Sequence, residues 1–135
     1  MAAGVRVRIE ELARLMTFDQ CAAAYIDVHR SSWKIAKHAR QWENTLATYA
    51  SHLIGALPVA AVDTDLVVKV LGPIWGTRTE TATRLRGRIE SILDWATVSK
   101  YRQGENPARW RSVRARVGAQ LARQGRGGLS PWRSA

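Results

Sequence analysis

The feature that most constrains the fold is an apolar stripe of helical period between residues 31 and 53. Six apolar residues recur at steps of four, three, four, three and four positions: Ile35, Ala39, Trp42, Leu46, Tyr49 and Leu53. This spacing places all six on one side of an α-helix, whereas the faces of a strand alternate every two residues. The segment is therefore predicted to be an amphipathic helix that packs its apolar side on a core.

Two neighbouring segments also carry helix signals. Residues 17–30 begin with Thr17, a good N-cap, and Gln20 follows at the spacing of a capping box. Residues 65–75 form a short apolar run after Asp63 or Thr64, either of which can cap a helix. Between the two helical stretches 31–53 and 65–75, the sequence PVAAV is expected to be a short extended link, and Gly72-Pro73 is expected to kink or end the helix of residues 65–75.

The fourth predicted helix runs from about Thr77 to Lys100. Its apolar residues fall within one arc of a helical wheel: Ala82, Leu85, Ile89, Ile92, Leu93 and Ala96. Thr81, Arg84 and Arg88 lie together on another arc, and Arg86 lies on the far flank of the apolar stripe. The sequence therefore predicts a compact all-α domain of four or so helices.

Length and composition fit one small soluble domain. The chain has 135 residues, of which 46% are hydrophobic, and no run of 18 apolar residues that could span a membrane. Its first residues are too charged for a signal peptide, so a cytoplasmic location is expected. The single cysteine, Cys21, lies in an apolar run and is predicted to be a small buried hydrophobe rather than a nucleophile.

The net charge of +10 is unevenly distributed. Residues 1–106 contain 14 Lys and Arg against 11 Asp and Glu, whereas residues 107–135 contain seven arginines and no acid. The last 25 residues also contain four glycines, which interrupt any periodicity. Such a segment cannot bury enough apolar surface to fold alone, although Val113, Val117 and Leu121 could form one or two amphipathic turns.

No catalytic or metal-binding pattern is found. The three histidines, His29, His38 and His52, are scattered, and none has a partner at metal-ligand spacing. The glycine-rich phosphate loops GxGxxG and GxxxxGK are absent as well. We therefore expect neither a metal nor another cofactor, and no enzymatic site.

Basic and polar residues beside the apolar stripes are the remaining candidates for function. On pattern alone, Arg84 and Arg88 are more simply explained as a solvated helix face or as ion-pair partners of Glu80 and Asp94. However, two predicted helices carry their bases in their N-terminal halves, mixed with Thr, Gln and Asn. Such residues can bind phosphates and read base edges, so a DNA-binding surface is the competing interpretation.

Several motifs, taken in order, carry a family resemblance. QWENTL, PIW, ETATRLRGRIE and NPARW, within residues 15–110, resemble the core-binding domain of phage-type integrases, the tyrosine recombinases of prophages. The resemblance implies a SAM-like bundle of four to five helices that binds double-stranded DNA during site-specific recombination and integration. In that family a catalytic domain completes a clamp around the DNA, and protomers also contact one another.

The resemblance also implies which residues contact DNA. Helices matching residues 31–53 and 77–100 face the major groove in this family. Carried over residue by residue, the DNA contacts are expected from Lys34, Lys37, Arg40, Gln41, Asn44, Arg78, Thr81, Arg84 and Arg88. Arg86 is expected instead to pack its stem over the edge of the core.

The expected organisation has three parts. Residues 1–16 are an N-terminal segment or partial linker, residues 17–111 are the core-binding domain, and residues 112–135 are an Arg/Gly-rich tail expected to be disordered or frameshift-derived. The integrase catalytic domain is expected to be absent, which would leave the chain inactive in strand cleavage. The alternatives are a helical protein–protein interaction module and a non-functional prophage remnant.

Overall fold

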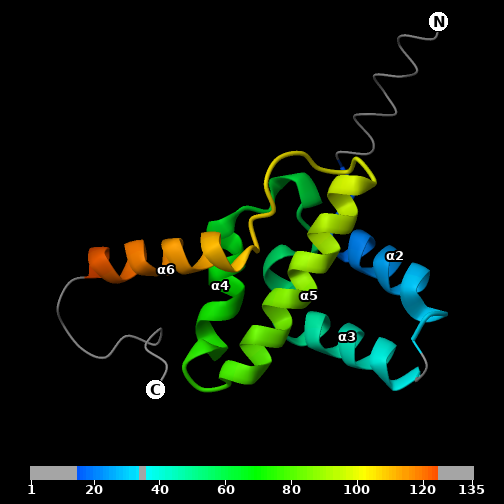
Figure 1. The fold of residues 1–135 in the computed structure, drawn as a ribbon, viewed down its shortest axis with the longest axis horizontal. Coiled ribbons are helices and arrows are strands. Elements are labelled where there is room, and N and C mark those ends of the chain that lie inside the picture. Colours follow the sequence, from blue (N-terminus) through cyan, green and yellow to red (C-terminus); the bar gives the residue numbers. More distant parts are fainter. Residues whose placement is uncertain (1–14, 34–35, 125–135) are drawn as a thin grey trace, which may run out of the picture.

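The computed structural model describes residues 15–33 and 36–124. Within these ranges the ordered elements are helical, with a single isolated bridge between Thr17 and Pro58. In chain order (Figure 1) they are α2 (Phe18–Arg30), α3 (Ala36–Tyr49), a π-helical turn η1 (Ser51–Gly55), a 3₁₀ turn η2 (Val59–Ala61), α4 (Thr64–Trp75), α5 (Thr79–Val98) and α6 (Trp110–Gln124). The predicted all-α, SAM-like bundle is confirmed.

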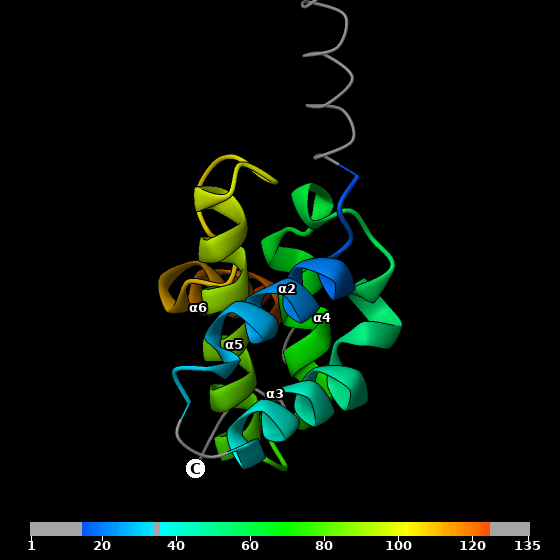
Figure 2. The same cartoon turned by 90° about the vertical axis from the view of Figure 1, so that its right-hand side faces the viewer.

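Helix α5 is the central element of the bundle. All six residues of its predicted apolar arc are fully buried. Helices α2 and α3 pack along one side of α5, whereas α4 packs on the other side, followed by α6 (Figures 1 and 2). The polar arc of α5 is consequently left facing α3, and this arrangement positions the candidate site.

The start of α2 follows the predicted capping box. The backbone N–H of Gln20 donates to Thr17 Oγ1 at 3.1 Å, and the backbone N–H of Thr17 donates to Gln20 Oε1 at 2.9 Å. These bonds satisfy two groups at the helix terminus that would otherwise lack partners. Cys21 in the first turns is fully buried, as predicted, and this burial raises the pKa of its thiol to about 11.

The predicted helix over residues 31–53 is interrupted. Helix α3 ends at Tyr49, and the π-helical turn η1 then carries the chain to Gly55. This turn packs against α2: Ser51 Oγ donates to Asp19 Oδ1 at 2.8 Å, and a Cβ at Gly55 would collide with the Asp19 carboxylate. Because glycine has no Cβ, the backbone approaches the Asp19 carboxylate here without displacing it.

The link after η1 differs from expectation, whereas helix α4 has the predicted cap and the predicted end. PVAAV contains the 3₁₀ turn η2 rather than a purely extended segment, because Val59 turns inward and is fully buried. The Asp63 side chain caps α4, accepting from the backbone N–H of Leu66 at 2.9 Å. Helix α4 continues through Pro73 to Trp75, which is the end that the sequence predicted, and Ile74 and Trp75 are buried in the core.

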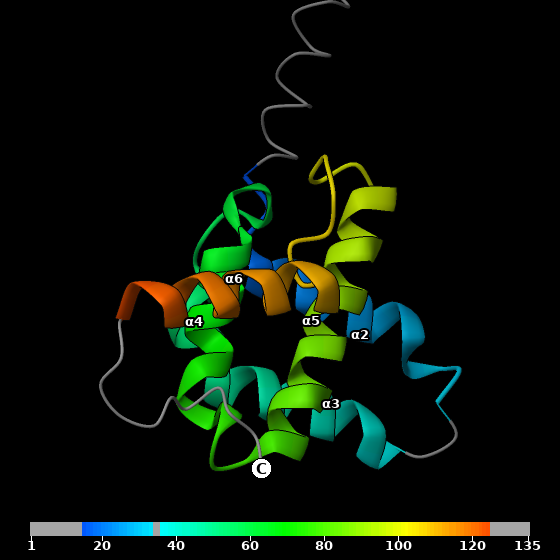
Figure 3. The ribbon, with the colours of Figure 1, turned by 60° about the vertical axis from the view of Figure 1, so that its left-hand side comes forward.

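Helix α6 crosses the predicted domain boundary at residues 111 and 112. It lies across α4 (Figure 3), with Val113 fully buried and the Trp110 ring stacked on Trp75 at 5.3 Å between centroids. The first part of the expected tail is therefore helical and packed, because its apolar side chains are covered by α4. Residues 125–135 of the expected tail and most of the segment 1–16 lie outside the described residues.

The described residues contain neither a candidate membrane-spanning helix nor a candidate metal cluster. No helix within 15–33 and 36–124 combines the length and the apolar character needed to cross a membrane. The same ranges contain no cluster of three His, Cys, Asp or Glu side chains that could hold a metal ion.

Candidate nucleic-acid interface

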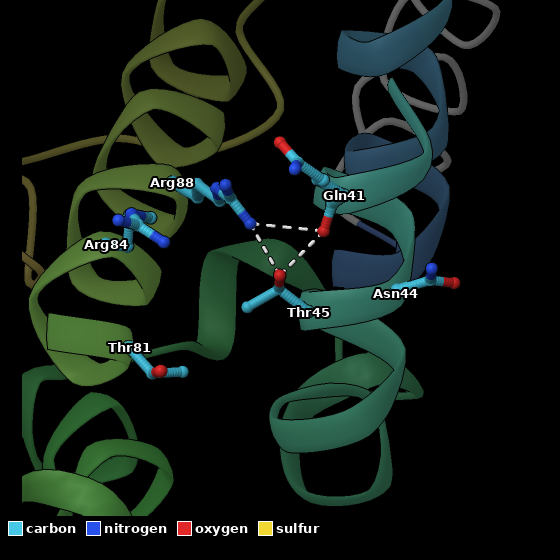
Figure 4. Close-up of a pocket in the computed structure, with 6 residues that line it drawn as sticks. All are labelled: Gln41, Asn44, Thr45, Thr81, Arg84 and Arg88. Carbon is cyan, nitrogen blue, oxygen red and sulfur yellow. Dashed lines mark hydrogen bonds between the residues drawn. The ribbon is translucent and has the colours of Figure 1, made fainter. Parts of the chain in front are cut away.

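A cleft between α3 and α5 brings most of the predicted site residues together. It has a volume of about 230 Å³ and is lined by Gln41, Asn44, Thr45, Thr81, Arg84 and Arg88 (Figure 4). Five of these six residues belong to the predicted set. The sixth, Thr45, was missed, although it follows Asn44 directly and lies one turn after Gln41 on the same helix edge.

Arg84 is the unengaged cation of this cleft. It is exposed, and within the part of the chain that the structure describes it makes no hydrogen bond or ion pair. The Gln41 and Asn44 side-chain amides are also exposed, and no described residue bonds to them. These three side chains are therefore available to an external ligand that offers hydrogen-bond acceptors or negative charge.

Arg88 lines the same cleft but is held by α3. Its Nη1 donates to Thr45 Oγ1 at 2.5 Å and to the Gln41 carbonyl oxygen at 3.1 Å (Figure 4). Its guanidinium lies 5.5 Å from the centroid of the Trp42 ring, within the range of a cation–π interaction. Burial, and secondarily the positive charge of Arg84, lower the pKa of the Arg88 guanidinium.

An aromatic cluster lies behind Arg88 and joins α3 to α2. Trp42 stacks on Tyr25 at 5.1 Å between centroids and packs beside Trp33 at 5.4 Å. His29 also stacks on Tyr25, with 4.1 Å between the ring centroids, and its Nδ1 forms a hydrogen bond with the Tyr25 carbonyl oxygen. Aromatic pairs at these separations add to the stabilisation that comes from burial alone.

The other predicted residues lie outside the lining of the cleft. Lys37 and Arg40 are exposed on α3. Arg78, the residue before α5, is exposed and donates through Nη1 to the Tyr49 hydroxyl at 3.1 Å. Lys34 lies outside the described residues.

Arg86 is separated from the cleft, as the helical wheel indicated. Its side chain is only 17% exposed, its Nη1 donates to the Ala108 carbonyl oxygen at 2.8 Å, and it pairs with Glu90 at 3.3 Å. Its guanidinium also lies 5.9 Å from the centroid of the Trp110 ring. Arg86 therefore connects α5 to the start of α6.

Carboxylates of the neighbouring helices are engaged away from the cleft. Glu43 pairs with Arg30, and Arg109 bridges Glu90 and Asp94. Neither Glu80 nor Asp94 is ion-paired with the cleft arginines in the described structure, which argues against the ion-pair explanation of Arg84 and Arg88. The cleft lining itself contains two arginines and no acid, so it is electropositive.

Comparison with known proteins agrees with this architecture. The phage integrase central domain matches residues 18–113. Protein Nmul_A0922 from Nitrosospira multiformis, whose structure was determined in solution by NMR, is 66% identical in sequence. That match covers 71% of this chain and 91% of the other, with a TM-score of 0.68. Comparison with curated proteins gave no match.

The family match spans α2 to the start of α6 and so includes every described residue of the cleft. It covers well over half of the chain. The protein belongs to the phage integrase central-domain family.

Proposed function

We propose that the chain is a DNA-binding module of the phage integrase type, which holds double-stranded DNA in the cleft between α3 and α5. The observation that carries the proposal is Arg84, which is exposed and pairs with none of the described residues, in a cleft whose lining contains no acid. A polyanion offers such a site a charged hydrogen-bond acceptor, and guanidinium groups suit phosphate oxygens. Family membership supports the same partner.

The proposed contacts divide by chemistry. Arg84, Lys37, Arg40 and Arg78 supply charge for phosphates. Lys34 is proposed as a further phosphate contact from the sequence alone. Gln41 and Asn44 carry exposed amides that can donate and accept at a base edge in the major groove, and Thr81 supplies a short hydroxyl. Such a surface would give binding of which a large part is independent of sequence and falls with salt.

We assign the chain no step of strand cleavage or joining. The matching family is the central domain of integrases, and the proposed role of the cleft is to hold DNA for chemistry carried out elsewhere. The competing functions, a protein–protein interaction module or a remnant that only folds, require no affinity of this cleft for DNA.

A salt titration of the full chain and its Arg84→Ala variant tests the proposal. Binding to a short mixed-sequence duplex is measured by fluorescence anisotropy at several salt concentrations. Removing one phosphate contact should lower the affinity by roughly 3- to 10-fold and reduce the slope of log K against log salt by about 1. The loss of slope reports the lost phosphate contact directly.

Lys69→Ala is the matched control. Lys69 is exposed on α4, outside the cleft lining, so this variant loses the same charge at a different place. It should retain nearly the affinity and slope of the unmodified chain. Equal losses for both variants would mean that net charge alone drives binding, and an unchanged Arg84→Ala variant would exclude the cleft as the DNA site.

A further inference from the structure

We propose that Arg88 is a positioning residue that fixes α3 against α5, and that it acts on DNA binding through the shape of the cleft and not by contacting DNA. This inference rests on the proposed function, since it concerns how the same cleft is built. It reassigns one member of the predicted contact set and adds Thr45 and Trp42 to the residues on which binding depends.

Hydrogen bonds among Arg88, Thr45 and the Gln41 carbonyl join α5 to α3, and this group is called the clip below. Arg88 Nη1, on α5, donates to both Thr45 Oγ1 and the Gln41 carbonyl oxygen, on α3. Thr45 Oγ1 in turn donates to the same Gln41 carbonyl at 2.6 Å (Figure 4). One guanidinium nitrogen thus donates to two oxygen atoms that are themselves joined by a hydrogen bond. Moving α3 away from α5 would break both hydrogen bonds of Arg88 Nη1.

The clip also contacts the aromatic cluster of α2 and α3. The Arg88 guanidinium lies over Trp42, which stacks on Tyr25 and packs beside Trp33. The rotamer of Trp42 is therefore fixed by contacts with α2 and with the segment before α3. Through this stack Arg88 connects three helices, and its bonding partners are a carbonyl, a hydroxyl and a ring, all of them neutral.

The clip also explains why two arginines one turn apart differ. Arg84 and Arg88 occupy the same arc of α5, at the i and i+4 positions, where like charges repel. Because Arg88 bonds to α3, its charge stays at the wall of the cleft, and no carboxylate among the described residues pairs with it. The donors of Arg84, by contrast, bond to none of the described residues. A phosphate approaching the cleft would meet the unengaged donors of Arg84 and would need to break the clip to bond to Arg88 through Nη1.

A double-mutant cycle between Arg88→Lys and Thr45→Val tests this inference in the full chain. Arg88→Lys keeps the charge but loses the planar group that lies over Trp42, and Thr45→Val keeps the shape but removes the hydroxyl. Each variant should lower the affinity for a mixed-sequence duplex by about threefold or more with an unchanged salt slope, because no phosphate contact is lost. The double variant should have about the same affinity as whichever single variant binds less tightly, since both substitutions break the same group of hydrogen bonds.

Three results would overturn the inference. They are an Arg88→Lys variant that binds as the unmodified chain does, a Thr45→Val variant without loss, and losses that simply add in the double variant. The last result would mean that Arg88 and Thr45 affect binding independently of each other. If Arg84→Ala weakens binding while these variants do not, the clip fails and the proposed function stands. If no variant, Arg84→Ala included, changes binding, the proposed function fails as well.

The clip can also be observed without DNA. In the free protein, NMR signals of the Arg88 guanidinium should show restricted rotation and slow exchange with water, and those of Arg84 should show neither. Thr45→Val should remove this protection from Arg88. Equal, unprotected signals for both arginines in the unmodified chain would contradict the inference whatever the binding data show.

Discussion

A chain that ends at Arg111 is expected to be less stable towards unfolding than a chain that ends at Gln124, by about 3 kcal/mol. The shorter chain loses the fully buried Val113 and the half-buried Val117, and it exposes the part of α4 on which α6 lies. It also loses the ion pair of Arg116 with Asp65, which is largely exposed and adds little. Most of the expected loss is therefore apolar burial.

Urea unfolding of the two chains, followed by far-UV circular dichroism, measures this difference. The control is Arg114→Ala in the longer chain, because Arg114 is exposed on α6 and no described residue pairs with it. That variant should change the free energy of unfolding by less than about 0.5 kcal/mol. Equal stability of the chains ending at Arg111 and Gln124 would mean that α6 adds nothing to the fold and that the domain ends near residue 111.

Replacing Asn106 by Leu should lower the free energy of unfolding by about 3 kcal/mol. Asn106 is 4% exposed, and its side chain makes three hydrogen bonds in the loop between α5 and α6. Its Nδ2 donates to the Glu90 carbonyl oxygen at 2.8 Å and to Asp94 Oδ1 at 2.9 Å, and its Oδ1 accepts from the Ala108 backbone N–H at 2.9 Å. Leucine would leave the buried Ala108 N–H without this acceptor and would remove both hydrogen bonds that tie the loop to α5.

The matched control for Asn106 is Gln103→Leu in the same loop. Gln103 is exposed, so losing its amide should cost less than about 0.5 kcal/mol. Both variants are compared by thermal and urea unfolding of the full chain. If Asn106→Leu were no more destabilising than Gln103→Leu, the Asn106 bonds would not be what fixes the loop to α5.

The Asn106 bonds also give a structural meaning to the NPARW motif. Pro107 and Ala108 are buried, Arg109 bridges Glu90 and Asp94, and Trp110 stacks on Trp75. Each residue of the motif therefore joins the end of α5 or the start of α6 to the bundle. Part of the sequence signature that the family resemblance rested on is thus structural and lies away from the candidate site.

Local periodicity was sufficient to predict the main helices and their faces. The apolar arc of α5 and the capping box of α2 depend on residues within a few positions of one another, and both were correct. The break after Tyr49 was not predictable in this way, because the turn that follows it contacts Asp19, which lies more than 30 residues earlier in the chain. The length of α6 was missed for the same reason, since Val113 is buried by α4.

The candidate site shows the same division between local and distant information. The helical wheel grouped Thr81, Arg84 and Arg88 correctly on one arc, and they line one cleft together with residues of α3. The wheel could not separate Arg84 from Arg88, because their difference depends on Thr45 and Trp42 of another helix. Whether a basic side chain is free or engaged is a property of the packed bundle.

A competing hypothesis places bound DNA on the arginines of α6. Arg111 and Arg114 are exposed on α6, which lies on the opposite side of α5 from α3 (Figures 1 and 2). A duplex bound through α6 would therefore occupy a different face of the bundle from one bound in the α3–α5 cleft. Affinity alone does not distinguish these two modes, but the location of the contacts does.

The most direct test of the central claim is NMR mapping of the full chain during titration with a short mixed-sequence duplex. The side-chain amides of Gln41 and Asn44 report on α3, Arg84 Nε reports on α5, and Arg111 and Arg114 Nε report on α6. If the α3–α5 cleft holds DNA, the largest shifts will occur at Gln41, Asn44 and Arg84. Shifts confined to Arg111, Arg114 and the residues that follow them, with α3 unperturbed, would contradict it.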